Sequence, residues 1–310
     1  MSTHLAVVGG RGWLGQAIVT EARRRRMTVT VVSRQPQAGA VAVDPADTSS
    51  LAAALARADV VVNAAGNYGL DDAKAATVAN YELPNQLGWL AARSGWALVH
   101  LGSAAEYGPG AAGPDPIDED HPCLPRSIYG LTKLAGTQAV TRWREQGARA
   151  TVARVFNVVD ADLPRQNPFH AIAEQVRAAA TGAGTGEVGI GDPTTTRDVS
   201  RRVTVAAAVV ALATAPATTP LPPVVNICSG RPTTFGDLAQ AMAEHLGAQV
   251  AVRDLGWPRG GQIVGSPRRL RELVGFPYVD RLHDLARTIL GTGQPTGPAP
   301  SIPQSAGDHL

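Results

Sequence analysis

The sequence predicts an α/β protein built on a doubly wound parallel sheet, with a smaller second domain after it. Short apolar runs of strand length alternate with helix-length segments through the first 160 residues, and a glycine-rich turn follows the first strand. Beyond that point the alternation is less regular. We therefore expect one domain over residues 1–160, a second mostly over residues 161–290, and a disordered tail over residues 291–310.

Composition narrows the class of protein. The chain has 310 residues, 44% of them apolar and 17% charged, and a formal net charge of +2. Such a small net charge does not indicate binding to nucleic acid. No apolar run reaches the roughly 18 residues of a membrane span. The first residues do not resemble a signal peptide, and the two cysteines form neither a disulfide framework nor a metal cluster. We expect a cytoplasmic protein that binds no nucleic acid, membrane or metal.

A turn of closely spaced glycines joins the first strand, residues 4–8, to a helix that covers about residues 13–26. A second strand follows, and glycines in this setting are typical of a Rossmann-type dinucleotide site. Gly9 allows the tight turn, Gly12 lets the backbone approach a pyrophosphate, and Gly15 permits close packing of helix on strand. The cofactor contacts expected here are Gly9, Arg11, Gly12, Trp13, Leu14 and Gly15.

The end of the second strand, residues 28–32, indicates which dinucleotide binds. An NAD site usually has an acidic residue here for the ribose hydroxyls, whereas this chain has Ser33 and Arg34. A guanidinium beside a hydroxyl suits a 2′-phosphate in charge and geometry, so we predict NADP(H) in preference to NAD(H). An Arg34 that only stacks on the adenine would not select the phosphate.

Strands and helices continue to alternate beyond this point. The predicted strands are apolar runs bounded by turn residues, as expected when both faces of a parallel sheet are covered. They lie at residues 40–43, 59–63 and 97–101, with helices at residues 49–57 and 74–92. Ligands bind at the carboxyl ends of such strands, so residues there complete the expected cofactor site. These are Asp44, which could reach the adenine, and the small residues Ala64, Ala65 and Gly66.

Two residues of a helix expected over about residues 127–146 carry the chemistry. Tyr129 and Lys133 are four residues apart, so one turn of helix places both on the same face. A phenol of pKa about 10 is a poor proton donor at neutral pH unless a positive charge lowers that pKa, and Lys133 can supply the charge. Ser103, at the end of the strand before, would hold a substrate carbonyl for Tyr129.

The glycine turn, Ser103 and the Tyr129-x-x-x-Lys133 pair together resemble extended short-chain dehydrogenase/reductases of the NAD-dependent epimerase/dehydratase family. The resemblance reaches to about residue 290. It implies that Tyr129 is the catalytic acid/base, that Lys133 lowers its pKa and holds the nicotinamide ribose, and that Ser103 orients the substrate oxygen. Because relatives commonly pack the tyrosine helix and its neighbour into a four-helix bundle, the resemblance also implies a homodimer.

The residues after Ser103 bear on the reaction type. Dehydratases of the family place an acidic pair directly after the serine or threonine, whereas this chain has Ala104 and Ala105. A methyl group cannot transfer a proton, so dehydration is disfavoured. Glu106, one residue later, is expected to be a solvated loop acid.

Later segments resemble nucleotide-sugar enzymes. Asn157 ends a strand in an Arg-x-x-Asn pattern, Arg197 lies in an Arg-Asp segment, and residues 226–230 resemble the Asn-x-x-Ser-Gly turn of GDP-6-deoxy-4-keto-mannose reductases. We expect the helix at residues 201–213 and the strand at residues 223–227 to return to the main sheet. The substrate contacts that follow are Ser103, Ala104, Asn157, Arg197, Arg231 and Arg268, the arginines being candidates for a diphosphate.

The function predicted from the sequence is NADPH-dependent reduction of a keto group at C4 of a nucleotide-linked deoxysugar, with Tyr129 as general acid. A nucleotide-sugar 4-epimerase with tightly bound NAD(P) would use the same residues. A non-catalytic NADP-binding sensor is also an alternative, although a sensor has no need of Ser103, Tyr129 and Lys133. A ketone other than a sugar stays open as the substrate.

Overall fold

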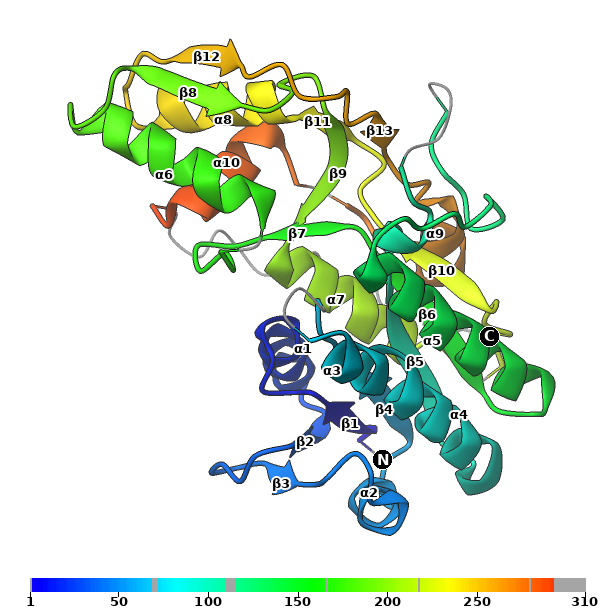
Figure 1. The fold of residues 1–310 in the computed structure, drawn as a ribbon. Helices are drawn as coiled ribbons and strands as arrows, with labels where there is room; N and C mark the ends of the chain where they lie inside the picture. The colour runs from blue at the N-terminus through cyan, green and yellow to red at the C-terminus, as the bar shows by residue number, and fades with distance from the viewer. Residues whose placement is uncertain are drawn as a thin grey trace, which may run out of the picture.

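The computed structural model describes residues 2–68, 72–109, 115–165, 167–216, 218–278 and 280–292. The tail that we predicted to be disordered lies outside these ranges from residue 293 onward. A large parallel sheet and its helices form the lower part of the view in Figure 1, and a smaller group of strands and helices forms the upper part.

Seven strands form the large sheet, all parallel, in the order β10-β6-β5-β4-β1-β2-β3. They are β1 (His4–Val8), β2 (Thr28–Ser33), β3 (Val41–Ala42), β4 (Val60–Asn63), β5 (Ala97–Ser103), β6 (Ala150–Val155) and β10 (Val224–Ile227). Every residue of β4 and β6 is buried, which agrees with the predominance of apolar residues in these strands. The order confirms the doubly wound sheet and places its switch point between β1 and β4.

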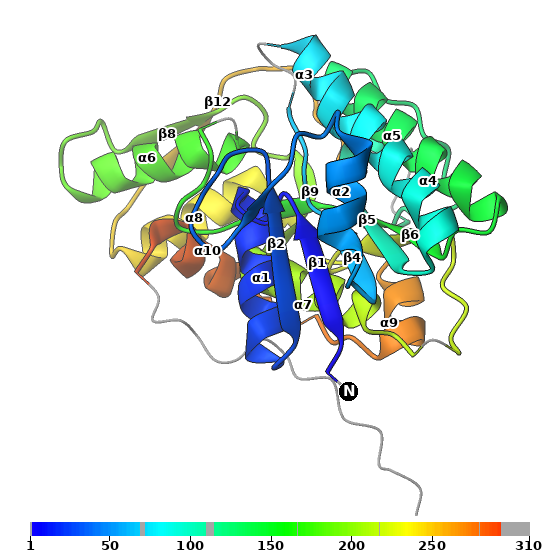
Figure 2. The ribbon, with the colours of Figure 1, turned by 90° about the horizontal axis from the view of Figure 1, so that it is seen from below.

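Helices cover both faces of the large sheet (Figure 2). One face carries α1 (Trp13–Arg24), α7 (Arg202–Ala213) and α9 (Arg268–Val274). The other carries α2 (Thr48–Leu55), α4 (Leu83–Ser94) and α5 (Ile128–Glu145). Helix α7 is buried along nearly its whole length because it also contacts strands of the smaller part, so its sequence is apolar all round.

The helix predicted over residues 74–92 is interrupted. It consists of α3 (Ala73–Thr77), a π-helical turn η1 (Val78–Glu82) and α4. Asn80 is fully buried in the turn, where its side chain accepts a hydrogen bond from Asn67 N and donates to Asn67 O and Thr132 Oγ1. A Cβ at Gly136 of α5 would overlap the carbonyl oxygen of Asn80. Contacts between distant segments thus stabilise a turn that periodicity alone does not predict.

The smaller part surrounds a second hydrophobic core that includes Phe169, Val188, Leu238 and Ile289. Its strands are β7 (Asn157–Val159), β8 (Glu187–Ile190), β9 (Thr196–Arg201), β11 (Pro232–Thr234), β12 (Ala251–Asp254) and β13 (Gln262–Ile263). Its helices are α6 (Pro168–Ala180), α8 (Phe235–His245) and α10 (Leu282–Leu290). Because β7 directly follows β6, the chain passes from the large sheet into this part beside the carboxyl ends of the parallel strands.

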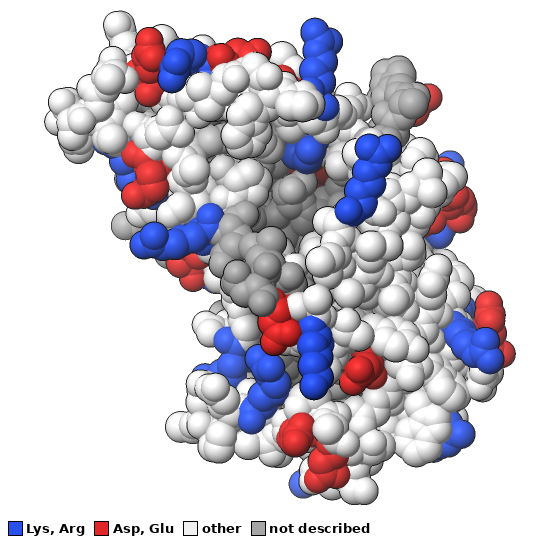
Figure 3. All heavy atoms as spheres, in the orientation of Figure 1, with Lys and Arg blue, Asp and Glu red and all other residues white. Residues whose placement is uncertain are grey.

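Surface side chains bear on two further expectations. Figure 3 shows acidic and basic side chains over the face that it draws, with several basic side chains gathered at the lower left of the view. Within the described ranges, no helix is long and apolar enough to cross a membrane. Tyr81, Trp89, Ile128 and Leu131, on or beside α4 and α5, are 36–53% exposed. The predicted homodimer would bury these apolar side chains, and it stays a prediction.

Candidate active site

A cleft of about 1020 Å³ opens at the carboxyl ends of the parallel strands, where doubly wound folds bind their ligands. The large sheet and α5 supply one wall, and β7, β9 and β13 contribute to the other. The predicted site residues that line it are Gly9, Arg11, Gly12, Trp13, Leu14, Ser33, Arg34, Ala64, Ala65, Gly66, Ser103, Ala104, Tyr129, Lys133, Asn157 and Arg197.

The glycine turn has the shape that a dinucleotide requires. Gly9 has a φ of +75°, and a Cβ there would lie 2.6 Å from the backbone nitrogen of Ala65, so only glycine fits. Helix α1 begins after Gly12 with neither a side-chain cap nor an acidic residue in its first turn. Its first amide groups and the positive end of its dipole are therefore suited to an anion. Gly15 lies beneath the turn, where a Cβ would overlap the carbonyl oxygen of Gly9.

Two arginines line the cleft near the end of β2. Arg34 follows β2 directly, and Arg11 of the glycine turn donates to the carbonyl of Ala38 in the loop that follows. Ser33 donates from Oγ to the carbonyl of Gln35 at 2.6 Å. Among the described residues, no acidic side chain forms an ion pair with Arg11 or Arg34. The two guanidinium groups therefore keep their positive charge for a ligand.

Asp44 does not line the cleft, although its neighbours Val43 and Pro45 do. Its carboxylate accepts a hydrogen bond from the backbone nitrogen of Ala46 at 2.9 Å and closes the turn after β3. We had expected this carboxylate to face the adenine. In the structure it instead accepts a hydrogen bond within the turn, which corrects that expectation.

Ser103 and Tyr129 meet in the cleft from β5 and α5. Ser127 caps α5, because its Oγ accepts a hydrogen bond from Gly130 N at 3.0 Å, and this places Tyr129 in the first turn of the helix. The ring of Tyr68 lies against that of Tyr129, with their centroids 4.9 Å apart. Burial raises the pKa of Tyr129 well above its ordinary value, Tyr68 and Glu106 add to the increase, and a hydrogen bond with Ser103 opposes it.

Lys133 is 3% exposed, and its Nζ donates to the carbonyl oxygen of Leu101. Burial lowers the pKa of Lys133 to about 8, and the carboxylate of Glu106 opposes this change. The sequence led us to expect that Lys133 lowers the pKa of Tyr129, whereas that pKa is raised. The reason is that burial penalises the phenolate, while the ammonium group is bonded to the Leu101 carbonyl instead.

Glu106 is fully buried, so the prediction of a solvated loop acid was wrong. Its carboxylate accepts hydrogen bonds from Ser103 N at 2.7 Å and Thr137 Oγ1 at 2.8 Å. It also forms an ion pair with the Arg154 guanidinium, whose Nη2 lies 2.9 Å away. A buried carboxylate is stable only when it is paired and hydrogen-bonded in this way.

Of the predicted substrate contacts, Asn157 and Arg197 line the cleft beside Ser103 and Ala104. Asn157 Nδ2 donates to the carbonyl of Asp198 at 2.9 Å. The Arg197 guanidinium donates to three backbone carbonyls, which belong to Thr196, Gly260 and Gly261. Burial lowers the pKa of Arg197, and Asp192 opposes this change. Neutral carbonyls hold this side chain in place without cancelling its charge.

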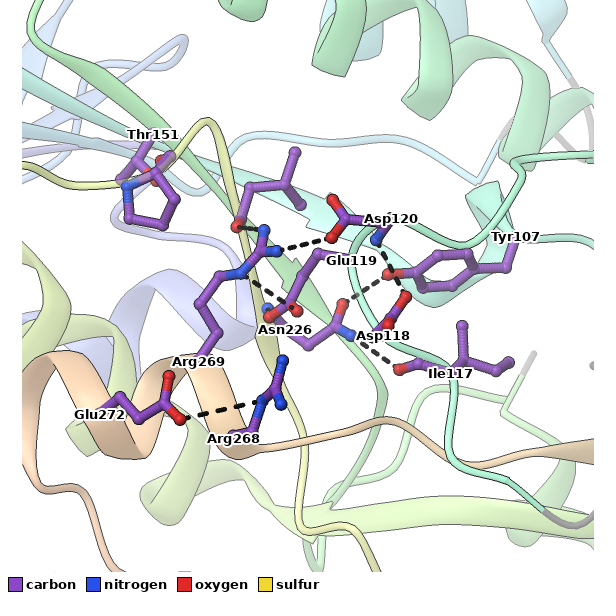
Figure 4. Close-up of polar contacts among 12 residues, drawn as sticks. Tyr107, Ile117, Asp118, Glu119, Asp120, Thr151, Asn226, Arg268, Arg269 and Glu272 are labelled. Atoms are coloured by element: carbon purple, nitrogen blue, oxygen red, sulfur yellow. Dashed lines mark hydrogen bonds and ion pairs between the residues drawn. The ribbon is translucent and has the colours of Figure 1, made fainter.

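Arg231 and Arg268 do not line the cleft. Arg231 donates to the carbonyl of Asp280 at 2.8 Å and lines a separate cavity of about 240 Å³. The Arg268 side chain is 77% exposed and faces Glu272 along α9, as Figure 4 shows. The structure therefore corrects the expectation that these two arginines contact the substrate, because α9 and the turn after β10 direct them elsewhere.

Tyr68 is a residue of the cleft that was not predicted from the sequence. It follows the small residues after β4, at the edge of the sheet where ligands bind, and its side chain is half exposed in the cleft. Its position five residues beyond Asn63 was the available signal, since segments that follow parallel strands form the site in this architecture. Contact with Tyr129 makes Tyr68 part of the candidate active site.

A doubly wound sheet with a glycine turn, and with serine, tyrosine and lysine facing one cleft, is the arrangement of an NAD(P)-dependent oxidoreductase of the extended short-chain type. The model of the NAD dependent epimerase/dehydratase family matches residues 5–228, and the chain belongs to that family. The dTDP-6-deoxy-L-talose 4-dehydrogenase (NAD(P)(+)) of Kitasatospora kifunensis is 32% identical in an alignment of 271 residues that covers 83% of this chain and 83% of that one.

Other similarities are shorter or more distant. The dTDP-4-dehydrorhamnose reductase of Streptomyces griseus is 34% identical in an alignment of 140 residues that covers 43% of this chain and 43% of that one. The structure of RMD from Pseudomonas aeruginosa, complexed with NADPH, superposes with a TM-score of 0.79 at 22% identity and covers 94% of this chain and 98% of that one. MoeE5 in complex with UDP-glucuronic acid and NAD gives a TM-score of 0.77 at 23% identity, over 93% and 98%. At these identities the two structures show the fold alone.

Proposed function

We propose that this enzyme uses NADPH to reduce a keto group of a nucleotide-linked deoxysugar, at C4. The observation that carries the proposal is the meeting of Ser103, Tyr129 and Lys133 in one cleft, with Ala104 and Ala105 where a dehydratase has acids. Two relatives, a dTDP-6-deoxy-L-talose 4-dehydrogenase and a dTDP-4-dehydrorhamnose reductase, support a dTDP-linked sugar as the first substrate to try.

Ser103 and Tyr129 have different roles at the substrate carbonyl group. When bound, the nicotinamide supplies the hydride. Ser103 holds the substrate oxygen, and Tyr129, which is hydrogen-bonded to Ser103, gives that oxygen a proton. Because the pKa of Tyr129 is raised, the phenol carries its proton at neutral pH, although the same change makes it a weaker acid than an ordinary tyrosine.

The basic residues at the end of β2 favour NADPH. The glycine turn and Ala64 to Gly66 would hold the dinucleotide, and Arg34, with Arg11, would bind a 2′-phosphate. Replacing Arg34 with alanine is expected to raise KM for NADPH about 10- to 100-fold, because a charge-assisted hydrogen bond is lost. KM for NADH, measured on the same variant, is the control and is expected to change little. Equal increases for both cofactors would contradict the assignment.

The pKa of Lys133 predicts how turnover depends on pH. Below about pH 8 the Lys133 side chain carries its proton and its charge, and above that pH both are lost. We therefore expect kcat/KM for the keto sugar to fall as the pH rises through about 8. A profile of kcat/KM that stays flat to about pH 10, the range of an unperturbed lysine, would contradict a role for the Lys133 charge.

The proposed reaction is tested by supplying the purified protein with NADPH and a panel of nucleotide-linked 4-keto-6-deoxyhexoses, the dTDP-linked sugar first. Consumption of NADPH with formation of the 4-hydroxy sugar is the expected result. Binding of the cofactor without its consumption, together with interconversion of 4-hydroxy nucleotide sugars supplied in a parallel reaction, would instead favour the 4-epimerase.

A further inference from the structure

Glu106 lies where the three elements that carry the proposed site come together. Its Oε1 accepts a hydrogen bond from the backbone nitrogen of Ser103, at the end of β5. Its Oε2 accepts from Thr137, one helical turn beyond Lys133 on α5, and from Arg154 Nε on β6 at 3.0 Å. One carboxylate therefore links the strand that ends in Ser103 to the helix that carries Tyr129 and Lys133.

The backbone packs closely around the Glu106 side chain. A Cβ at Gly102 would lie 2.7 Å from Glu106 Oε1, so the glycine lets the carboxylate approach the strand. Helix α5 also comes close, since a Cβ at Gly130 would lie 2.5 Å from the Ala105 carbonyl oxygen. A shorter or bulkier group in place of the carboxylate would shift Ser103 relative to α5.

Contacts outside the cleft hold the partner of Glu106 in place. The Arg154 guanidinium lies 4.4 Å from the ring centroid of Tyr107. Tyr107 donates from its hydroxyl to Asn226 Oδ1 at 2.7 Å, and Asn226 Nδ2 donates to the carbonyl of Ile117 at 3.0 Å, as Figure 4 shows. This network holds the Arg154 guanidinium through Tyr107, Asn226 and Ile117, none of which lines the cleft.

The charge of Glu106 also acts on the site. The carboxylate of Glu106 raises the pKa of four described groups, which are Arg154, Lys133, Tyr129 and Cys123. Its negative charge raises the pKa of Lys133 and of Tyr129, so it favours the protonated form of both. Lys133 faces one more titratable group, the buried His100, whose pKa burial lowers well below its ordinary value.

We propose that Glu106 is a positioning residue: its buried carboxylate fixes Ser103 relative to α5 and provides the negative charge that Lys133 faces. This inference goes beyond the assignment of Ser103, Tyr129 and Lys133, and it rests on their proposed roles. Glu106 itself does not line the cleft, so it acts through those residues and not on the substrate.

The charge effect can be measured without any substrate, because Lys74 and Lys133 are the only lysines of the chain. Protein labelled with ¹³C at the lysine Cε gives two NMR signals, and a Lys74→Arg sample identifies that of Lys133. Glu106→Gln keeps the shape and removes the charge, so the titration midpoint of Lys133 is expected to move below its wild-type value of about 8. Thr137→Val, which removes one hydrogen bond and leaves the charge, is the matched control and is expected to leave the midpoint unchanged.

Kinetics test the positioning. Glu106→Gln is expected to lower kcat about 10- to 100-fold with little change in KM, and to move the alkaline limb of the pH profile to lower pH. A folded Glu106→Gln with wild-type kcat and a wild-type Lys133 midpoint would overturn the proposal. If Glu106→Gln does not fold, Glu106→Asp replaces it: the charge remains, so the midpoint should stay near that of the wild type while kcat falls, and wild-type kcat would overturn the proposal.

The outcomes separate this inference from the proposed function. A wild-type protein that reduces no keto sugar, but whose Lys133 midpoint moves in Glu106→Gln, would reject the reaction and keep the charge effect. Normal turnover by the wild type and by Glu106→Gln, without any shift of the midpoint, would reject the role of Glu106 and keep the reaction.

Discussion

Replacing Tyr129 with phenylalanine is expected to lower kcat by about 10²- to 10⁴-fold, the range that a general acid contributes. The variant keeps the ring that packs against Tyr68 and loses only the hydroxyl that is hydrogen-bonded to Ser103. The cofactor would still have the glycine turn and Arg34, so its affinity is expected to stay within a few fold. Single-turnover kinetics and NADPH fluorescence titration measure the two quantities separately.

A matched control for this variant is Tyr278→Phe. Tyr278 is a partly buried tyrosine outside the cleft, and its buried hydroxyl has no hydrogen-bond partner among the described residues. Its loss is expected to leave kcat unchanged. If Tyr129→Phe loses NADPH affinity as severely as kcat, Tyr129 has a structural role and the assignment of the general acid fails.

Replacing Arg154 with methionine is expected to destabilise the fold by about 3–5 kcal/mol, because it leaves the Glu106 carboxylate buried without its partner. The side chain of Arg154 is 3% exposed and that of Glu106 is fully buried, so water cannot take the place of the guanidinium. Urea denaturation followed by circular dichroism measures the change as a lower midpoint.

The double variant Glu106→Gln/Arg154→Met is the control for that prediction. With both charges removed, much of the lost stability is expected to return, because the cost comes from the unpaired charge and not from the missing contacts. If the urea midpoint of the Arg154→Met variant equals that of the wild type, the buried ion pair does not stabilise the fold. A double variant as unstable as the single one would assign the loss to packing instead.

The parts of the fold that local sequence determines were predicted well. Gly9 and Gly12 lie in the turn before α1, Gly15 packs beneath that turn from the helix, and β4 and β6 are buried along their whole length, so pattern and structure agree. The meeting of Ser103 and Tyr129 followed from a rule about strand ends, because the carboxyl ends of parallel strands share one edge.

The remaining features depend on contacts between distant segments, which periodicity does not encode. Glu106 was predicted to be solvated because it lies in the loop after β5, and its partner Arg154, 48 positions away in the sequence, gave no local signal of burial. Resemblance suggested Arg231 and Arg268 by residue type, yet their side chains point away from the cleft. The direction of the pKa change at Tyr129 depends on burial, which the spacing between Tyr129 and Lys133 does not contain.

Hydride transfer is the most direct test of the central claim. The protein would be incubated with NADPH that carries deuterium at C4 of the nicotinamide and with a dTDP-linked 4-keto-6-deoxyhexose, and the product analysed by mass spectrometry and NMR. The proposed function predicts that one NADP⁺ forms for each molecule of product. It also predicts deuterium at C4 of the sugar when the deuterium is on the face of the nicotinamide from which the enzyme transfers hydride. An isomerised nucleotide sugar without deuterium, and with no net formation of NADP⁺, would contradict it.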